Sequence, residues 1–482
     1  MTTPSPAHPD RRLLVIGGGI TGLAAAYQGS CSGARVCLIE ADDRLGGKIR
    51  TDTTTDGLII EHGPDSFVTY RPGASELIEE LGLTGRLIGT RGQRKVFMHS
   101  RGRLLPMPDG MGQVLPTRLG PFITTRTLGW PDKLRAAADL VLPRQLRDGT
   151  DVSIGDFLTR RLGPGIVQRF AEPLVGGIYG ASVHDLSLDA VLPGLRANEL
   201  EHRSLLVASL AAGRRARRSA AARGGSVFNS LRGGMGELVA TCQAALEAAG
   251  TDLRIGLRVT GLRAAADGAT LAQLSDGNQL ISDAVVLACG PAAAAGLLAS
   301  HAPAAAEALT VIPLASTAVF TLVWSVQDFA MPPTQHGWLE ADPAPIGGVT
   351  ISSAKWTGRA PEHLVLVRAF VPDRVRGGTT DDPDTELAKV LAHLQPLLGA
   401  SRPPQRTFTT HWQGVMPKYT VGHLTRAAAV ERELARCQPT WQVAGSALHG
   451  VGLPDCIADG RRAALAALDA VQPTTGSVQS AS

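Results

Sequence analysis

The residues between Leu13 and Glu40 have the types and spacing of a phosphate-binding turn followed by a ribose-binding acid. An apolar stretch at 13–16 precedes a segment that satisfies the pattern G-x-G-x-x-G and consists of Gly17, Gly18, Gly19, Ile20, Thr21 and Gly22. Glycines at these positions permit a tight turn, a backbone free of Cβ beside a pyrophosphate, and close packing of helix on strand. The chemistry that this spacing predicts is the binding of an adenine dinucleotide.

The elements around the glycines must place this turn correctly for the prediction to hold. We expect a strand at 13–16, an alanine-rich helix over 23–28, and a second strand over 35–39 that leads to Glu40. The helix start would direct free N–H groups and its positive dipole end at the phosphates, and Glu40 would bind the ribose. A glycine pattern alone is weak in a chain with 55 glycines, so an ordinary glycine turn is the alternative.

A second glycine turn follows the acid and narrows the choice of dinucleotide. The segment Glu40 to Lys48 contains Ala41, Arg44 and Gly47, and it resembles the E-x-x-x-R-x-G-G-[RK] signature of FAD-binding amine oxidases and desaturases. Cations near a buried pyrophosphate would balance its charge. The resemblance implies FAD, with these residues among its contacts, whereas solvated surface cations are the alternative for Arg44 and Lys48.

Length and composition favour an enzyme of two or three domains and exclude several other classes. The chain has 482 residues, 44% hydrophobic and 19% charged, with a formal net charge of +4, so general affinity for nucleic acid is not expected. The sequence contains no uninterrupted run of about 20 apolar residues, so no transmembrane span is expected. The polar start at 1–12 leaves no room for a signal peptide, which makes the cytoplasm the expected compartment. The six cysteines show no metal-ligand spacing, and no metal site is predicted.

The predicted fold class is α/β, with a discontinuous Rossmann-like FAD-binding domain, an α+β substrate domain and a helical subdomain. Further buried strands are expected at 253–255, 284–288 and 441–444, which would return to the first sheet. The expected division is a first FAD-binding part (1–69), a substrate and helical region (70–226), a second FAD-binding part (227–291), a substrate sheet (292–409), a C-terminal FAD-binding part (410–472) and a disordered tail (473–482). The arginine-rich stretch 214–225 predicts a solvated loop, and attraction of a polyanionic substrate or an anionic membrane surface is the alternative.

Four further segments make the resemblance specific. They are Glu61–Phe67 (EHGPDSF), Phe228–Gly236 (FNSLRGGMG), Met416–His423 (MPKYTVGH) and Gly450–Ile457 (GVGLPDCI). Together with the glycine turns they resemble the bacterial oxygen-dependent porphyrinogen oxidases, over almost the whole chain. The resemblance implies noncovalent FAD and a tetrapyrrole substrate that loses six electrons and six protons in three rounds. It also implies O2 as the electron acceptor and hydrogen peroxide as a product.

The resemblance also assigns roles around the flavin. It implies that the flavin is bordered by Gly63, Pro64, Asp65 and Ser66, while Val451, Gly452 and Leu453 offer backbone donors, Val259 contacts the adenine side and Trp412 packs near the isoalloxazine. From the residues alone, a surface turn, a helix cap and ordinary core packing are the respective alternatives. No nucleophile or acid–base pair stands out, so no catalytic residue is predicted and the chemistry is expected to belong to the cofactor.

The substrate is the most open point of the sequence. Arg71 is the best candidate for binding a propionate, ahead of Lys355 and Arg359, and exposed cations are the alternative. Coproporphyrinogen III is the favoured substrate and protoporphyrinogen IX the alternative. More distant alternatives for the function are an amine oxidase or desaturase and a noncatalytic flavin-binding factor of the haem pathway. The sequence leaves open a peripheral contact with the inner face of the membrane and gives no sign of the oligomeric state.

Overall fold

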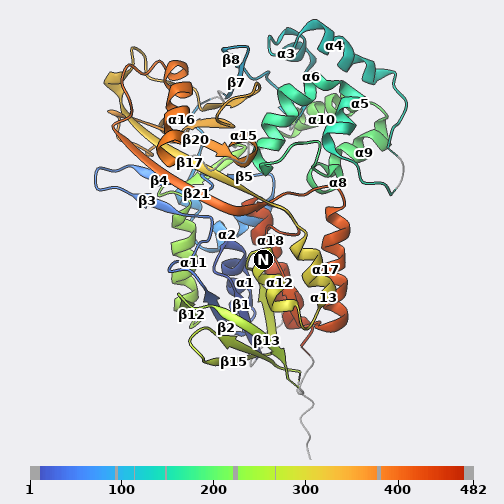
Figure 1. Cartoon of the computed structure of the whole chain (residues 1–482), viewed down its shortest axis with the longest axis vertical. Coiled ribbons are helices and arrows are strands. Elements are labelled where there is room, and N and C mark those ends of the chain that lie inside the picture. Colours follow the sequence, from blue (N-terminus) through green and yellow to red (C-terminus); the bar gives the residue numbers. More distant parts are fainter. Residues whose placement is uncertain are drawn as a thin grey trace, which may run out of the picture.

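The structure is a computed structural model that describes residues 11–92, 96–112, 114–146, 149–220, 226–265, 268–376 and 382–471. The expected disordered tail at 473–482 and the last residues of the arginine-rich stretch lie outside these ranges. Figure 1 shows three parts: a lower part around a parallel sheet, an upper sheet crossed by long strands, and a cluster of helices beside it. No helix among the described residues is long and apolar enough to cross a membrane.

A parallel sheet organises the lower part of the molecule. Its strands run in the order β12 (Asp252–Ile255), β2 (Arg35–Glu40), β1 (Arg12–Ile16), β16 (Ala284–Leu287) and β22 (Trp441–Val443). These strands come from three distant stretches of the chain, and all four pairings between neighbours are parallel. The discontinuous Rossmann-like sheet expected from the sequence is therefore present.

Both faces of this sheet are covered, as the apolar character of its strands requires. Alternate residues of β1 contribute to two different cores: Leu13 and Val15 to one, Leu14 and Ile16 to the other. The first core is closed by α1 (Ile20–Cys31), α2 (Pro72–Glu80), α11 (Gly236–Ala248) and α18 (Leu453–Asp469). The second is closed by the antiparallel strands β13 (Val259–Ala264), β14 (Thr270–Leu274) and β15 (Gln279–Ser282) and by the helices α12 (Pro291–Leu298), α13 (Pro303–Thr310) and α17 (His423–Cys437).

The upper sheet has seven strands, in the order β21 (Arg406–Pro417), β17 (Leu314–Ser325), β20 (Leu364–Pro372), β19 (Gly348–Ile351), β18 (Gly337–Glu340), β7 (Val96–Ser100) and β8 (Arg103–Pro106). β17 pairs antiparallel with β21 on one side and with β20 on the other. Helix α16 (Pro383–Leu398) packs on this sheet through Val390 and Leu394. β7 and β8 join the sheet from a distant part of the sequence, because β7 pairs in parallel with β18.

The helical part has a core of its own. Its helical segments are α3 (Leu119–Thr124), α4 (Trp130–Ala137), η2 (Ala138–Leu140), α5 (Ile154–Leu162), α6 (Pro164–Ile166), the π-helical η3 (Val167–Gly176), α7 (Gly177–Tyr179), α8 (Leu188–Val191), α9 (Pro193–His202) and α10 (Leu205–Ala220). The prediction of a loop at 214–225 is wrong for residues 214–220, which continue α10. Alanine and arginine are good helix formers, so the basic composition gave no reason for a break there.

Candidate functional site

The predicted dinucleotide turn lies at the C-terminal edge of the parallel sheet, between β1 and α1. Gly17 has a φ of +108°, and an ideal Cβ there would lie 2.8 Å from the Ala288 oxygen. A Cβ on Gly22 would lie 1.8 Å from the Gly17 oxygen. Both glycines are therefore required by the protein's own packing, as the spacing predicted.

Gly19 differs from its neighbours because the protein does not fill the space beside it. A Cβ on Gly19 would meet no described atom within 4 Å. Gly19 is also the N-cap of α1, and no side chain accepts a hydrogen bond at this helix end. The first N–H groups of a helix need acceptors from outside the helix, and phosphate oxygens serve this purpose. The open space at Gly19 fits the phosphates of a dinucleotide.

The second glycine turn packs directly on the first. The Gly46 N–H donates to the Gly18 oxygen at 2.8 Å, and a Cβ on Gly47 would lie 3.1 Å from the Gly19 Cα. The guanidinium of Arg44 donates to the carbonyl oxygens of Leu45, Gly47 and Ile49. Arg44 is thus neither free nor merely solvated: its contacts hold the second turn in shape beside the first.

Glu40 ends β2 where the ribose was expected. Its carboxylate accepts hydrogen bonds from the backbone N–H groups of Gly18 and Asp42. The backbone N–H of Leu257 donates to the backbone oxygen of Glu40 at 2.9 Å. This contact brings Val259, at the start of β13, to the same end of the sheet. Val259 itself is 6% exposed and belongs to a core cluster, so both readings of this residue are compatible with its position.

Lys48 is a partly buried cation whose described hydrogen bonds include no carboxylate. Its Nζ donates to the Val415 oxygen at 2.9 Å and to Ser446 Oγ at 3.0 Å. Burial lowers the pKa of Lys48 from its usual value. An ammonium held in this way favours an acceptor-rich or anionic ligand, and its position rules out the alternative of a solvated surface cation.

The segment Gly63–Ser66 packs against Lys48. A Cβ on Gly63 would lie 1.9 Å from the Lys48 oxygen, so only glycine fits there. The indole Nε1 of Trp412 donates to the His62 oxygen at 2.8 Å, which places this tryptophan beside Gly63. The ring of His62 turns the other way, toward Thr410 and Asp52, and burial lowers its pKa although Asp52 opposes the shift.

Asp65 anchors this segment through a buried ion cluster. Its carboxylate accepts from Lys355 Nζ at 3.0 Å and from Trp356 Nε1 at 3.0 Å, and Arg368 lies 3.9 Å away. Burial opposes ionisation of Asp65, but Lys355 and Arg368 outweigh it and keep the pKa well below its usual range. Asp65 is therefore a carboxylate that fixes the backbone of the segment.

The C-terminal motif reaches the same place from the other side. A Cβ on Gly445 would lie 3.1 Å from Thr21 Oγ1, and one on Gly460 would lie 2.2 Å from the Thr21 oxygen. Gly452 is the N-cap of α18 and, like Gly19, has no side-chain cap. The loop at Gly445 and the middle of α18, at Gly460, therefore adjoin the start of α1.

Tyr419 and His423, which the sequence did not single out as site residues, hold this segment in place. The Tyr419 hydroxyl donates to the Ser446 oxygen at 2.8 Å and accepts from the Gly450 N–H at 2.7 Å. The rings of Tyr419 and His423 stack at 3.7 Å, and His423 Nε2 donates to the Leu448 oxygen. Burial lowers the pKa of His423 to about 4. Both residues lie in the segment 416–423, but its pattern gave no sign of these contacts.

The candidate cations for propionates have different environments. Arg71 is 49% exposed and forms an ion pair with Asp455, the third residue of α18. Lys355 is committed to Asp65, and Arg359 is only 1% exposed and bonds to Ser230 Oγ at 2.6 Å. Arg71 is the most accessible of these three cations, and the alternative of an exposed cation does not hold for Lys355, which is 17% exposed, or for Arg359.

Comparison with known proteins adds the family context. Residues 20–468 match the family described as flavin containing amine oxidoreductase. A coproporphyrinogen III oxidase of Propionibacterium freudenreichii subsp. freudenreichii is 53% identical, over 98% of this chain and 94% of its own. A coproporphyrinogen III oxidase of Bacillus subtilis is 33% identical, over 95% of this chain and 98% of its own.

A solved structure shares the whole architecture. A protein from Exiguobacterium sp. 255-15, provisionally named a protoporphyrinogen oxidase, superimposes with a TM-score of 0.81 at 31% identity, over 95% of this chain and 98% of that one. These findings confirm the predicted fold class, the resemblance and the flavin cofactor. They also show that the chain is an oxidoreductase.

Proposed function

Because the chain belongs to the family of flavin-containing amine oxidoreductases, we propose that it oxidises coproporphyrinogen III to coproporphyrin III with bound FAD, as a step of haem biosynthesis. The observation that carries the proposal is the 53% identity, over nearly full length, to a relative with that name. The coproporphyrinogen oxidase of Bacillus subtilis supports it at lower identity. O2 is the proposed electron acceptor, with hydrogen peroxide released in each round.

The residues described above have distinct roles in this proposal. The open side of Gly19 and the uncapped start of α1 hold the pyrophosphate, and Glu40 holds the ribose. Lys48 and the segment Gly63–Ser66 position the flavin end, and Trp412 packs beside that segment. Bound FAD supplies the acceptor for hydride equivalents from the porphyrinogen, and the chain's own residues bind and orient the two reactants.

Arg71 is the proposed contact for a substrate carboxylate. Arg71 is the N-cap of α2. This end of α2 packs closely on α18, as a Cβ built on Gly73 would lie only 2.4 Å from the backbone oxygen of Pro454. The Arg71 guanidinium is half exposed and already pairs with Asp455, so part of it stays available for a second, bidentate partner. Replacing Arg71 by Ala should raise KM by about tenfold with little change in kcat.

The control for that experiment is Arg406→Ala. Arg406 also forms a half-exposed ion pair, with Asp56, at the far end of β21. Its replacement should leave KM unchanged. Equal values of KM in the two variants would contradict the role of Arg71.

We propose a cytoplasmic enzyme that contacts the membrane peripherally through its helical part, and the surface of that part supports the proposal. Large apolar side chains are exposed on α3, α4 and the turn after them: Leu119, Ile123, Trp130, Leu134, Leu140 and Val141. Exposed Arg118, Arg126 and Arg144 lie among them in sequence, and Lys133 Nζ lies 4.9 Å from the Trp130 ring. Apolar side chains interspersed with cations suit an anionic bilayer surface.

Amine oxidation is the less favoured alternative. Tyr419 and Tyr179 form an aromatic pair with centroids 5.6 Å apart, but Tyr419 is 2% exposed and its hydroxyl is committed to the loop 446–450. Such a pair supports the loop and does not form an open cage for an amine. Ser446, which follows Gly445, accepts from Lys48 and adds a further internal contact.

The experiment that tests the proposal is aerobic turnover of the FAD-loaded protein on coproporphyrinogen III and protoporphyrinogen IX, side by side. Porphyrin fluorescence and peroxide would be followed together. We expect the higher kcat/KM for coproporphyrinogen III, with peroxide formed in step with porphyrin. A preference for protoporphyrinogen IX would contradict the substrate assignment, and no porphyrin from either would contradict the reaction and favour a noncatalytic flavin-binding factor.

A further inference from the structure

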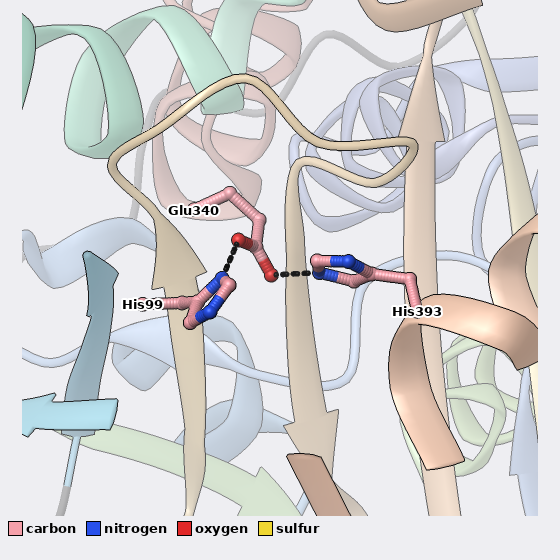
Figure 2. Close-up of side chains that lie close together, drawn as sticks. All are labelled: His99, Glu340 and His393. Carbon is pink, nitrogen blue, oxygen red and sulfur yellow. Dashed lines mark hydrogen bonds and ion pairs between the residues drawn. The ribbon is translucent and has the colours of Figure 1, made fainter. Parts of the chain in front are cut away.

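Three side chains with metal-binding chemistry converge at the edge of the upper sheet, in a place that the proposed reaction does not use. His99 comes from β7, Glu340 from the end of β18 and His393 from α16. Figure 2 shows both imidazole rings directed at the carboxylate from opposite sides. His99 Nδ1 lies 2.6 Å from Glu340 Oε2, and His393 Nε2 lies 3.0 Å from Glu340 Oε1.

The surroundings of this cluster hold Glu340 in place but leave both histidine side chains partly accessible to solvent. The Glu340 side chain is 3% exposed, and the Trp338 indole donates to its Oε1 at 2.9 Å. The His99 and His393 side chains are 13% and 18% exposed. An outer hydrogen bond to a ligating carboxylate and partial access for solvent are both features of metal sites in proteins.

We propose that His99, Glu340 and His393 bind a divalent transition-metal ion of the zinc type. The three ligand atoms already lie within 4.8 Å of one another. Zinc–nitrogen and zinc–oxygen distances of about 2.0–2.2 Å in a tetrahedron place ligand atoms roughly 3.4 Å apart. The contacts of His99 and His393 with the carboxylate, at 2.6 Å and 3.0 Å, need to lengthen by about 0.8 Å and about 0.4 Å to reach this spacing.

The ligand types select this class of ion. Two imidazole nitrogens and one carboxylate oxygen suit zinc, cobalt, nickel and copper, whereas calcium and magnesium prefer oxygen ligands alone. For the ion to bind, the nitrogens that face Glu340 must be unprotonated, so each neutral ring carries its hydrogen on the other nitrogen. Three protein ligands leave a fourth position for water.

The ion would join three elements that are distant in sequence. β7 and β18 are neighbouring strands, and α16 packs on the same sheet. Binding to the folded chain alone stabilises it by mass action. The proposed role of the ion is to fix α16 to the sheet at the neighbouring strands β7 and β18. The inference does not depend on the substrate of the enzyme.

The test is titration of the FAD-loaded, chelator-treated full chain with Zn²⁺ alone, followed by calorimetry, and with Co²⁺, followed by its visible absorption. We expect one ion per chain and a rise in the unfolding midpoint with Zn²⁺. His99→Gln and His393→Gln should each weaken Zn²⁺ binding at least tenfold. Glutamine keeps an N–H donor for Glu340, so these variants are expected to fold without the metal.

The matched control is His184→Gln. His184 forms a similar pair with Asp156, at 2.8 Å, but both side chains are about half exposed and the pair has no third ligand among the described residues. Zn²⁺ binding should be unchanged in this variant. The proposal is overturned if the wild-type chain shows no stoichiometric Zn²⁺ binding, or if the double variant His99→Gln/His393→Gln binds Zn²⁺ as the wild type does.

Discussion

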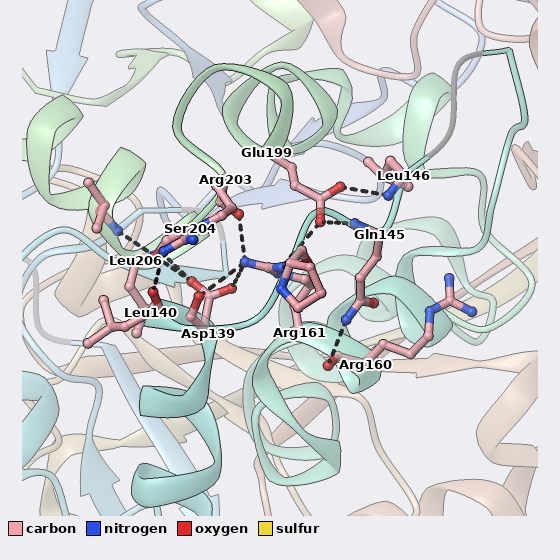
Figure 3. A network of polar contacts seen from close by, with 12 residues as sticks. Asp139, Leu140, Gln145, Leu146, Arg160, Arg161, Glu199, Arg203, Ser204 and Leu206 are labelled. Atoms are coloured by element: carbon pink, nitrogen blue, oxygen red, sulfur yellow. Dashed lines mark hydrogen bonds and ion pairs between the residues drawn. The ribbon is translucent and has the colours of Figure 1, made fainter.

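The helical part and the candidate flavin site each contain a buried ion cluster, and the two are built differently. In the helical part, Arg161 lies between Asp139 and Glu199, and all three side chains are 0% exposed. Figure 3 shows this network, in which Ser204 and the backbone of Leu206 also donate to Asp139. At the flavin site, the carboxylates of Glu61 and Asp65 face three cations, Lys355, Arg359 and Arg368.

The difference separates a structural cluster from one that serves a site. The helical network has one cation for two carboxylates, and its members span only residues 139–206, joining η2, α5 and α9. The flavin-site cluster has an excess of cations, and Arg368 donates to the backbone oxygen of Gly63, in the segment that we propose borders the flavin. Burial raises the pKa of Glu61, although Thr51 and Arg359 oppose the shift.

The largest effect is expected from Asp139→Asn. It leaves Arg161 with one carboxylate in a fully buried place, and loss of one partner of a buried ion pair costs about 3–5 kcal/mol of unfolding free energy. Urea unfolding measures this loss, while the flavin absorption spectrum should stay unchanged. Asp156→Asn, in an exposed pair, is the control and should unfold like the wild type. A loss of FAD with Asp139→Asn would break the distinction between the clusters.

Asp65→Asn should affect both stability and the cofactor. It removes the carboxylate partner of Lys355 and the nearest one of Arg368, at an expected cost of about 2–3 kcal/mol, because this cluster is less completely buried. FAD should also bind more weakly, since the Gly63–Ser66 segment loses its anchor. Fluorescence titration with FAD measures the affinity. Unchanged affinity with lowered stability would make the two clusters equivalent.

Gly19→Ala and Gly22→Ala sharpen the comparison within the flavin site. The Gly19 variant should keep the stability of the FAD-free protein and bind FAD at least tenfold more weakly, a loss of about 1.4 kcal/mol. The Gly22 variant clashes with the Gly17 oxygen and should lose stability even without FAD. Both quantities come from thermal unfolding with and without FAD. Wild-type FAD affinity in the Gly19 variant would show that the open space does not face the cofactor.

The smallest effect concerns His423. Its folded-state pKa of about 4 lies below the unfolded value of 6.5, so the unfolded state binds more protons between these values. Stability is then complete above about pH 6.5 and falls as the pH drops, by about 1 kcal/mol from roughly pH 7 to pH 5.5. His423→Gln should show a shallower dependence in this range. An identical slope in both proteins would contradict the shift.

Local sequence predicted much of the cofactor side, because glycine patterns and apolar strands act through neighbouring residues. The turn at 17–22, the strands at 284–287 and 441–443 and their return to one sheet all follow from such patterns. The motif at 61–67 singled out Gly63 and Asp65 as site residues. It could not reveal the partners of Asp65, which lie about 290 residues away in the sequence. One signal was available: Arg368 interrupts an otherwise apolar strand, and a buried cation requires a partner.

The histidine cluster could not have been predicted in this way. His99 and Glu340 are separated by 241 residues and Glu340 and His393 by 53, and neither spacing is a metal-binding motif. His99 and Glu340 meet because β7 pairs with β18, two strands that are far apart in the sequence. The expectation that no metal site exists rested on local spacing alone.

The measurement that tests the central claim most directly is anaerobic mixing of the FAD-loaded protein with coproporphyrinogen III. The account predicts loss of the oxidised-flavin absorbance in the absence of O2, because one FAD accepts two of the six electrons, and recovery of the absorbance together with porphyrin fluorescence and peroxide when O2 is admitted. A flavin spectrum that stays unchanged in the presence of coproporphyrinogen III would contradict the account.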